Sequence, residues 1–173
     1  MLSLQALRQI RDGSALNQAT PVISAGLSNP GAPRTRGVTL DGISVDAVSI
    51  NATLNYLRAN GLDTVADTYG IHIYPNANVT PEQRYKDLAK NALAQCGKYG
   101  VSCTVTEWGF RLPGLTCPLN DSSRYNLAYE ILSDVANWGS TVRSMVWFDW
   151  LSPQYGLYQC GAETATGHLV LGQ

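Results

Sequence analysis

The segment TYGIHIY, residues 68–74, decides the fold of this 173-residue chain. It is rich in β-branched and aromatic residues, which is typical of a strand. Three more runs of this kind occur along the chain, TPVISAGL at 20–27, VSCTVT at 101–106 and VRSMVWF at 142–148. Helical patterns separate the four runs, so each crossover is long enough to require parallel pairing. The sequence therefore predicts an α/β protein with four parallel strands.

The helical pattern between the second and third runs is the clearest one. Thr80 is a suitable N-cap, Pro81 takes the first helical position, and Gln83 completes a capping box. Gly97 lies where a C-terminal cap belongs. The apolar residues recur at three- and four-residue spacing, at Tyr85, Leu88, Ala89, Ala92, Leu93 and Cys96. We predict a helix that begins after Thr80 and ends before Gly97.

Other helical patterns lie next to the remaining strands. We expect the first dozen residues to be helical, a second helix to stop at Asn60 and Gly61, and a third to follow Asp121 and Ser122. Their apolar positions are Leu4, Leu7 and Ile10, then Ile50, Leu54 and Leu57, and finally Tyr125, Ala128, Tyr129, Leu132 and Val135. The Gly- and Pro-rich stretch 28–42 is predicted to be a long loop after the first strand.

Composition limits the classes of partner. The chain has 12 Lys and Arg against 13 Asp and Glu, a net charge of -1, which gives no electrostatic case for a nucleic-acid or anionic-membrane partner. Apolar residues make up 45% and charged residues 14%, values that indicate a globular core and exclude overall disorder. No run reaches the roughly 18 apolar residues of a membrane-spanning helix. We predict one soluble domain over residues 1–173.

Four cysteines allow three disulfide pairings. We favour Cys96 with Cys103, which would bracket a short turn, and Cys117 with Cys160, which would join two later loops. Reduced thiols and a metal site are the alternatives, but the chain has no CxxC motif and its two His lie far from the cysteines in sequence, so no metal is predicted. Disulfides indicate a secreted or periplasmic protein, although no signal peptide is visible at the start.

Side chains capable of chemistry gather just after the predicted strands. His72 and Tyr74 end the second strand, Glu107 and Trp108 follow the third, and WFDW at 147–150 closes the fourth. Parallel strands would bring all three groups to one rim. A carboxylate, an imidazole, a phenol and several indoles suit a sugar ring, because aromatic faces stack on its C–H groups and polar groups bind its hydroxyls.

The ordered motifs HIYP at 72–75, TEWG at 106–109 and WFDW at 147–150 resemble the C-terminal half of a retaining glycoside hydrolase of the clan A barrels, nearest to the cellulase-like family 5. The resemblance covers about residues 20–150. It implies a parallel (β/α) half-barrel that corresponds to strands five to eight of a TIM barrel. It also implies hydrolysis of β-linked glucan or mannan, with Glu107 as the nucleophile and with no metal or organic cofactor.

The remaining site residues surround this carboxylate in our interpretation. We expect substrate-binding roles for His72, Tyr74, Trp108, Trp147, Asp149 and Trp150. The resemblance places His72 and Tyr74 in the site and makes Trp147 the better match to the aromatic residue at the end of strand eight, with Trp150 second. The aromatic residues have a competing interpretation, because such side chains usually fill a core.

The acid/base Glu of the family is missing, because it follows strand four and that strand would precede this chain. A retaining mechanism needs two carboxyls roughly 5 to 5.5 Å apart. Asp149 is the other carboxylate close behind a predicted strand, and we expect it to bind a sugar hydroxyl instead. Two alternatives follow: a carbohydrate-binding pseudoenzyme, or a structural domain whose main partner is another half-barrel. An esterase using Ser24 or Ser28 with His72 is disfavoured, because no G-x-S-x-G motif is present.

A half-barrel leaves two sheet edges and one inner face, predicted to be apolar, without partners. Such surfaces favour association. We expect a homodimer, because a two-fold axis would cover both open edges at once. A missing N-terminal half-barrel and a relaxed open sheet are the alternatives.

Overall fold

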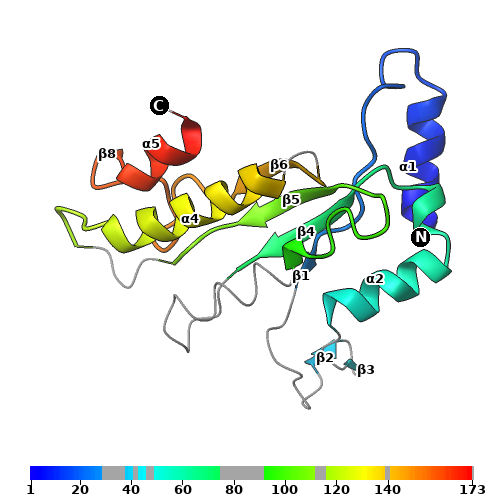
Figure 1. Ribbon diagram of the computed structural model, residues 1–173, viewed down its shortest axis with the longest axis horizontal. Coiled ribbons are helices and arrows are strands. Elements are labelled where there is room, and N and C mark those ends of the chain that lie inside the picture. Colours follow the sequence, from blue (N-terminus) through cyan, green and yellow to red (C-terminus); the bar gives the residue numbers. More distant parts are fainter. Residues whose placement is uncertain are drawn as a thin grey trace.

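Helices alternate with the strands of one parallel sheet in the computed structural model (Figure 1). The structure describes residues 1–28, 38–40, 43–45, 49–74, 92–111, 116–138 and 141–172. Its helices are α1 (Leu2–Asp12), α2 (Ile50–Ala59), the 3-10 turn η1 (Leu62–Thr64), α4 (Ser122–Trp138) and α5 (Ala165–Leu171). The α/β class predicted from the sequence is confirmed.

The main sheet contains β1 (Leu27–Ser28), β4 (Tyr69–Ile73), β5 (Cys103–Trp108) and β6 (Val142–Trp147). They lie in the order β1-β4-β5-β6, and every neighbouring pair is parallel. Each strand falls in or overlaps one of the four runs identified in the sequence. Chain order therefore equals sheet order, which brings the carboxyl ends of all four strands to one rim.

Residues 38–40 differ from their prediction as part of a long loop. Strands β2 (Val38–Leu40) and β3 (Ile43–Val45) form an antiparallel pair there. An Asp-Gly dipeptide separates the two strands in the sequence, which is a strong hairpin signal that the Gly- and Pro-rich composition concealed. The first part of that predicted loop, residues 29–37, lies outside the described residues.

The helix predicted after Thr80 also lies mostly outside the described residues, which resume at Ala92. Ala92 and Leu93 are helical and buried. Gly97 adopts a left-handed φ of 74°, but its amide donates to the Val101 carbonyl, so it belongs to the turn before β5 and not to the predicted helix cap. The helix predicted to end at Asn60 and Gly61 is α2, with Asn60 as its C-cap.

Helix α4 exists where it was predicted, but its buried face is rotated by one residue. Leu127, Ala128 and Ile131 are buried, whereas Tyr129 is 56% exposed. Arg124 lies on this buried face and is surrounded by hydrogen-bond acceptors. Tyr129 stacks on Tyr125 at the surface instead.

The two faces of the sheet differ in chemistry. Ile71 and Val105 belong to the apolar core together with Leu54 of α2 and Ile131 of α4. Alternate residues on β4 and β5 point the other way, and they are mostly small and polar. The inner face was expected to be apolar; this expectation is wrong for its two central strands.

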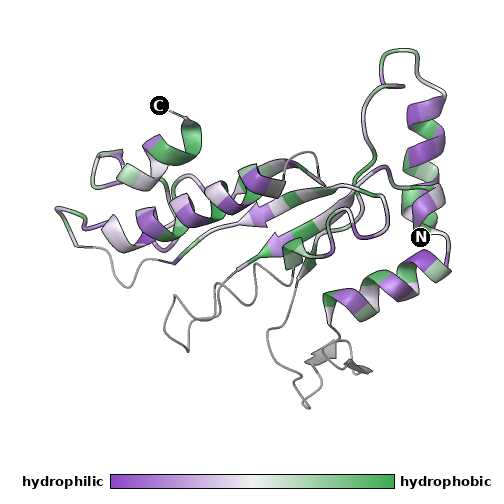
Figure 2. Cartoon of the chain, viewed as in Figure 1, coloured by the Kyte–Doolittle hydropathy of each residue, from purple (hydrophilic) through white to green (hydrophobic). Residues whose placement is uncertain are grey.

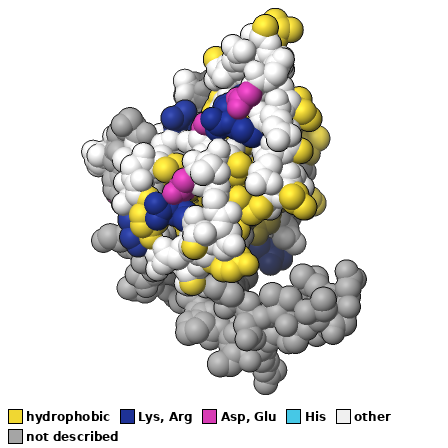
Figure 3. Space-filling model, turned by 90° about the vertical axis from the view of Figure 1, so that its right-hand side faces the viewer, with side chains coloured by type: hydrophobic (Ala, Val, Ile, Leu, Met, Phe, Trp, Pro, Cys, Tyr) yellow, Lys and Arg dark blue, Asp and Glu magenta, His cyan; other side chains and the backbone are white. Residues whose placement is uncertain are grey.

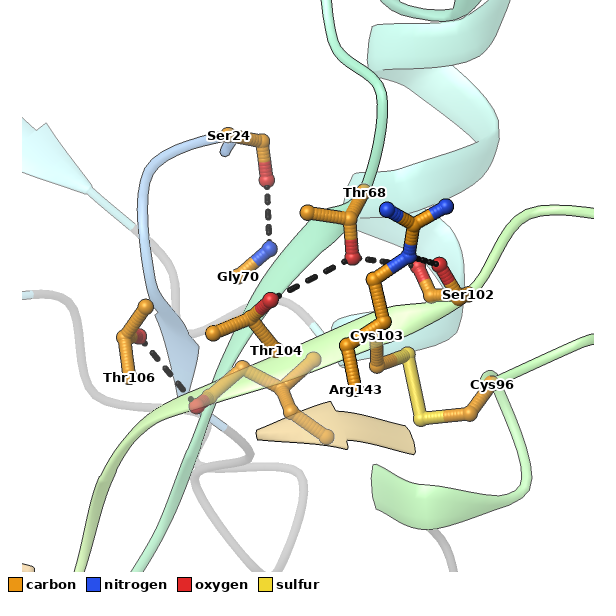
Figure 4. Close-up of a disulfide and its surroundings, with 10 residues drawn as sticks. Ser24, Thr68, Gly70, Cys96, Ser102, Cys103, Thr104, Thr106 and Arg143 are labelled. Carbon is orange, nitrogen blue, oxygen red and sulfur yellow. Dashed lines mark hydrogen bonds between the residues drawn. A yellow bond between two sulfur atoms is a disulfide. The ribbon is translucent and has the colours of Figure 1, made fainter. Parts of the chain in front are cut away.

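Hydrogen bonds within the sheet satisfy this polar face (Figure 4). Ser24 Oγ accepts from the Gly70 amide at 2.9 Å, and Thr68 Oγ1 donates to the Ser102 carbonyl at 2.8 Å. Thr68 Oγ1 also lies 3.4 Å from Thr104 Oγ1. All three side chains, those of Ser24, Thr68 and Thr104, are buried. Their hydroxyl groups have hydrogen-bond partners within the chain, as buried polar groups require.

Both favoured disulfides are present. Cys96 is bonded to Cys103 with 5.1 Å between their Cα atoms, and Cys117 to Cys160 with 5.8 Å. The first connects the turn before β5 to that strand (Figure 4), and the second connects the segment before α4 to the hairpin of β7 (Tyr158–Gln159) and β8 (Ala162–Glu163). Two disulfides are consistent with an oxidising compartment.

On the face formed by α1 and α2, acidic and basic side chains lie next to one another (Figure 3). Asp67 accepts hydrogen bonds from Arg8 at 2.8 Å and Arg11 at 2.6 Å, and Arg58 pairs with Asp63 at 2.8 Å. Both helices alternate hydrophilic and hydrophobic residues along their length (Figure 2). None of the helices in the described part of the chain has the length and apolarity needed to cross a bilayer.

Candidate functional site

Glu107, His72 and Tyr74 lie together at the carboxyl end of the sheet. The Tyr74 hydroxyl donates to Glu107 Oε2 at 2.7 Å, and His72 Nδ1 lies 3.5 Å from the same oxygen. Both contacts involve Oε2, and the Glu107 side chain is 39% exposed. The carboxylate is therefore anchored through one oxygen and remains accessible to solvent.

A β-bulge in β5 makes this meeting possible. Ile71 pairs with Val105 and His72 with Glu107, so Thr106 is an extra residue in the ladder. Strict alternation from Thr104 would direct Trp108 to the face of His72 and Glu107 toward the helices. The bulge exchanges the two faces, so that Glu107 lies on the face of His72 and Trp108 lies toward the helices.

Burial raises the pKa of Tyr74 far above its ordinary value, and the hydrogen bond to the Glu107 carboxylate raises it further. Tyr74 therefore stays protonated at neutral pH and remains a donor there. A permanent donor holds the carboxylate in one orientation, with a lone pair of Oε2 occupied.

His72 is confined on both edges of its ring. Ser28 Oγ lies 3.4 Å from Nδ1, and a Cβ added at Gly26 would lie only 1.8 Å from Nε2. Glycine is therefore required at position 26 by the close approach of the imidazole. Ser28 and Glu107 both lie near Nδ1, whereas a hydrolytic Ser-His-acid triad needs them on opposite ring nitrogens. The geometry does not support an esterase.

Three aromatic rings cluster together, and one of them, Tyr74, contacts the Glu107 carboxylate. Tyr74 lies 6.0 Å from Phe148 and 5.9 Å from Tyr155, and Phe148 lies 5.9 Å from Tyr155, all measured between ring centroids and all edge to face. Phe148 is 40% exposed. These rings form an aromatic rim beside Glu107.

Phe148 and Tyr155 were missed as site residues. Phe148 lies inside the WFDW motif, in which only the two tryptophans and the aspartate were predicted to bind substrate. Tyr155 comes seven residues later, in an irregular segment whose sequence does not predict a strand. Gly109 of the TEWG motif brings this segment close, because a Cβ there would lie 2.7 Å from the Phe148 carbonyl oxygen. The Phe148 amide donates to the Trp108 carbonyl at 2.8 Å.

Trp108 and Trp147 occupy the helix side of the sheet. Trp108 is 1% exposed and packs against Trp147, with 4.8 Å between ring centroids, and against Phe110. Trp147 Nε1 donates to the Tyr155 carbonyl at 2.9 Å. Trp147 thus supports the aromatic rim through the backbone of Tyr155.

Asp149 and Trp150 lie in the segment after β6. Asp149 Oδ1 accepts from the Ser152 amide at 2.7 Å, and the charge of this carboxylate contributes to raising the pKa of Tyr74. Trp150 stacks on Tyr158, with 6.0 Å between ring centroids. Of the predicted site residues, the structure joins His72, Tyr74 and Glu107 directly. It packs Trp108 and Trp147 against the core and leaves Trp150 exposed on the segment after β6.

A buried ion pair supports the segment that carries Tyr155. Arg124 donates to Asp121 Oδ1 at 2.6 Å, to the Tyr155 carbonyl at 3.1 Å and to the Gly156 carbonyl at 2.9 Å. The side chains of Arg124 and Asp121 are 2% and 5% exposed. In the sequence this pair has the i,i+3 spacing that is common for ion pairs on helix surfaces, so the sequence alone does not predict that it is buried.

The site offers a fixed carboxylate beside a phenol donor, an imidazole and an aromatic rim. Such a group can attack an electrophilic carbon or stabilise developing positive charge. The described residues contain no group of three His, Cys, Asp or Glu side chains placed to hold a metal ion. Compared with known proteins, the chain matches no family model and no curated protein.

Proposed function

We propose that this chain is a carbohydrate-active domain of the retaining glycoside hydrolase type, which acts on β-linked glucan or mannan with Glu107 as the nucleophile. The observation that carries the proposal is the Glu107 carboxylate held by Tyr74 and His72 beside an aromatic rim. The resemblance of HIYP, TEWG and WFDW to the clan A barrels supports the same reaction. We further propose that the protein works outside the cell or in the periplasm, because it carries two disulfides.

The fold supports the half-barrel interpretation of the parallel sheet. Strands β1, β4, β5 and β6 would correspond to strands five to eight of a TIM barrel. In that arrangement Glu107 ends strand seven, which is the position of the nucleophile in the family. The edge strand β6 exposes Val146 by 55%, and α1 exposes Ile10 by 70%. We propose that a second copy, or an N-terminal half-barrel, covers these surfaces.

The acid/base carboxylate is then supplied by that partner. Asp149 is engaged as an acceptor for the Ser152 amide, which supports a role in shaping the segment and binding a hydroxyl. A carbohydrate-binding pseudoenzyme is the second candidate function. It is favoured by the contacts of Glu107 among the described residues, which come from a phenol and an imidazole and not from a second carboxyl.

A covalent trap tests the proposal without needing an acid. A 2,4-dinitrophenyl 2-deoxy-2-fluoro-β-glycoside has a leaving group that departs without protonation. The Glu107 carboxylate attacks the anomeric carbon, a carbon–oxygen ester bond forms, and the C–O bond to dinitrophenolate breaks with its electron pair leaving on that group. We expect one equivalent of dinitrophenolate per chain and a sugar ester on Glu107 in peptide mass spectrometry.

The exposed Glu130 of α4 is the internal control and should stay unlabelled. Gluco- and manno-configured reagents separate the two sugars. Absence of label on Glu107 with both reagents, under conditions in which a known retaining glycosidase is labelled, overturns the nucleophile assignment and leaves the pseudoenzyme.

Gly26→Ala is predicted to impair this labelling more than it impairs folding. The new Cβ would overlap His72 Nε2, so the imidazole must leave its place beside Glu107. A rotamer change costs on the order of 1 kcal/mol in stability, whereas a misplaced site group lowers the rate by about 10- to 100-fold. The labelling rate and the melting temperature are measured together.

Ala25→Ser serves as the neighbouring control, because the Ala25 side chain is exposed. A Gly26→Ala chain that labels at the unmodified rate would show that the position of His72 does not matter for Glu107.

A further inference from the structure

Arg124 of α4 is a buried cation whose hydrogen bonds reach the irregular segment after β6. Its guanidinium donates to the Tyr155 carbonyl at 3.1 Å and to the Gly156 carbonyl at 2.9 Å. Its other bonds go to Asp121 Oδ1 at 2.6 Å and to Thr164 Oγ1 at 3.1 Å. A buried ion pair is weak evidence for a gain in stability, because apolar residues of similar volume are often as stable. Stability alone therefore does not explain why a charge lies there.

The guanidinium is itself fixed by groups from two helices. Asp121 Oδ2 accepts from the Thr166 amide of α5 at 2.7 Å, while the other oxygen of this carboxylate binds Arg124 of α4. Thr164 Oγ1 accepts from Arg124 and also from the Gly167 amide at 3.0 Å, by which it caps α5. Regular elements define the position of a side chain more exactly than loops do. The donors that Arg124 presents to the segment are therefore held in place.

The Tyr155 carbonyl accepts from two side chains. Trp147 Nε1 donates to it at 2.9 Å, in addition to the Arg124 guanidinium. The two donors lie next to each other, because the guanidinium carbon of Arg124 is 5.8 Å from the centroid of the Trp147 ring. A carbonyl oxygen has two lone pairs, so both are occupied. The backbone at Tyr155 is thus fixed in direction, although it belongs to a turn and to no helix or strand.

Contacts continue from Tyr155 to Glu107. The Tyr155 ring lies 5.9 Å from the Tyr74 ring between centroids, edge to face, and the Tyr74 hydroxyl donates to Glu107 Oε2 at 2.7 Å. Burial and the hydrogen bond to Glu107 raise the pKa of Tyr74, and Tyr155 contributes further to raising it. A shift of the Tyr155 backbone would therefore move a ring that packs against the hydrogen-bond donor of Glu107.

We infer that Arg124 is a positioning residue, which sets the position of the Glu107 carboxylate through Tyr155 and Tyr74. Asp121 belongs to the same device, because it orients the guanidinium. The inference rests on the proposed function for the reaction in which Glu107 takes part. An apolar pair in place of Arg124 and Asp121 could keep the segment packed, but it could not donate to the two carbonyls, so the Tyr155 ring would lose its fixed direction.

Replacement of both charges at once separates position from folding. Arg124→Met combined with Asp121→Leu leaves neither charge buried alone. We expect the rate at which the fluoro-glycoside labels Glu107 to fall about tenfold, because a misplaced site group slows the reaction. Fluorine NMR of chains that carry fluorotyrosine reports on Tyr74 without any sugar. The Tyr74 resonance, assigned from its absence in Tyr74→Phe, should move in the double variant.

Leu62→Ala is the matched control for lost stability. Leu62 is fully buried in η1 before the amino end of β4, whereas Tyr74 follows the carboxyl end of that strand. The cavity should lower the melting temperature at least as far as the double replacement does. It should nevertheless leave the labelling rate and the Tyr74 resonance unchanged. Equal slowing in Leu62→Ala would show that lost stability alone slows the labelling, and it would overturn the positioning role.

A double-mutant cycle tests the route through Tyr155. Tyr155→Ala is itself expected to slow the labelling about tenfold, and in that chain the double replacement should change the rate by less than about twofold. A further tenfold loss there would show that Arg124 acts by another route. An unchanged rate and an unchanged Tyr74 resonance in the double variant would show that the pair only stabilises the fold. Either result overturns the inference.

The two readouts also keep the nucleophile and the positioning role apart. If the unmodified chain is not labelled on Glu107, the nucleophile assignment fails, and the Tyr74 resonance then decides whether Arg124 positions the carboxylate. If Glu107 is labelled and the Tyr74 resonance stays in place in the double variant, the nucleophile stands and the positioning role fails.

Discussion

Glu107→Gln is expected to reduce the turnover of a dinitrophenyl β-glycoside by about a thousandfold or more. The amide is a poor nucleophile and carries no charge to stabilise the oxocarbenium-like transition state. Its oxygen can still accept the hydrogen bond that Glu107 receives from Tyr74 at 2.7 Å, so the site should keep its shape. The measurement is kcat/KM for both chains, with the melting temperature as a check on folding.

Glu130→Gln provides the matched control, because it makes the same chemical change on an exposed position of α4. It should leave kcat/KM within about twofold. Equal turnover in the Glu107→Gln and unmodified chains would remove Glu107 from catalysis. In a Glu107→Ala chain, which leaves space for the anion, azide should attack the anomeric carbon and release dinitrophenolate to give an α-glycosyl azide, whereas a misfolded chain would show no such rescue.

The second large effect is expected on stability. Arg124→Met should lower the free energy of unfolding by about 3–5 kcal/mol, because removal of one member of a buried ion pair leaves the other charge buried without compensation. Asp121 is 5% exposed at its side chain and, among the described residues, would keep the hydrogen bond from the Thr166 amide. For a chain of this size the melting temperature should fall by roughly 10 °C.

Arg58→Met makes the same change in the more exposed ion pair of Arg58 with Asp63. The side chains of Arg58 and Asp63 are 28% and 36% exposed. There the loss should be several-fold smaller, because solvent screens an exposed pair. Denaturant unfolding of both variants gives the comparison. Similar losses for Arg124 and Arg58 would show that burial does not distinguish the two pairs, and the double variant Arg124→Met with Asp121→Leu should recover part of the loss.

The strands and disulfides could be predicted because their signals are local. Alternating β-branched and aromatic residues mark β4 and β5, and Cys96 and Cys103 lie seven residues apart around a turn. Parallel strands whose carboxyl ends meet at one rim indicated that Glu107 and His72 would lie at the same rim, but not that their side chains would share a face.

Features that depend on tertiary contacts could not be predicted. The bulge at Thr106 exchanges the sheet faces on which the Glu107 and Trp108 side chains lie, and the TEWG sequence contains no pattern that predicts a bulge. Arg124 lies on the buried face of α4 and donates to the carbonyls of residues 155 and 156, which are 31 and 32 positions away. Tyr155 reaches the rim only because Trp147 and Arg124 hold its carbonyl.

The polar inner face has a consequence for protein engineering. Ser24, Thr68 and Thr104 are satisfied by groups of their own sheet, so no complementary polar surface has to be supplied from outside. Replacement of these side chains by apolar ones would leave buried groups such as the Gly70 amide without a hydrogen-bond partner. Redesign of this part of the sheet therefore has to replace the hydrogen bonds together with the side chains.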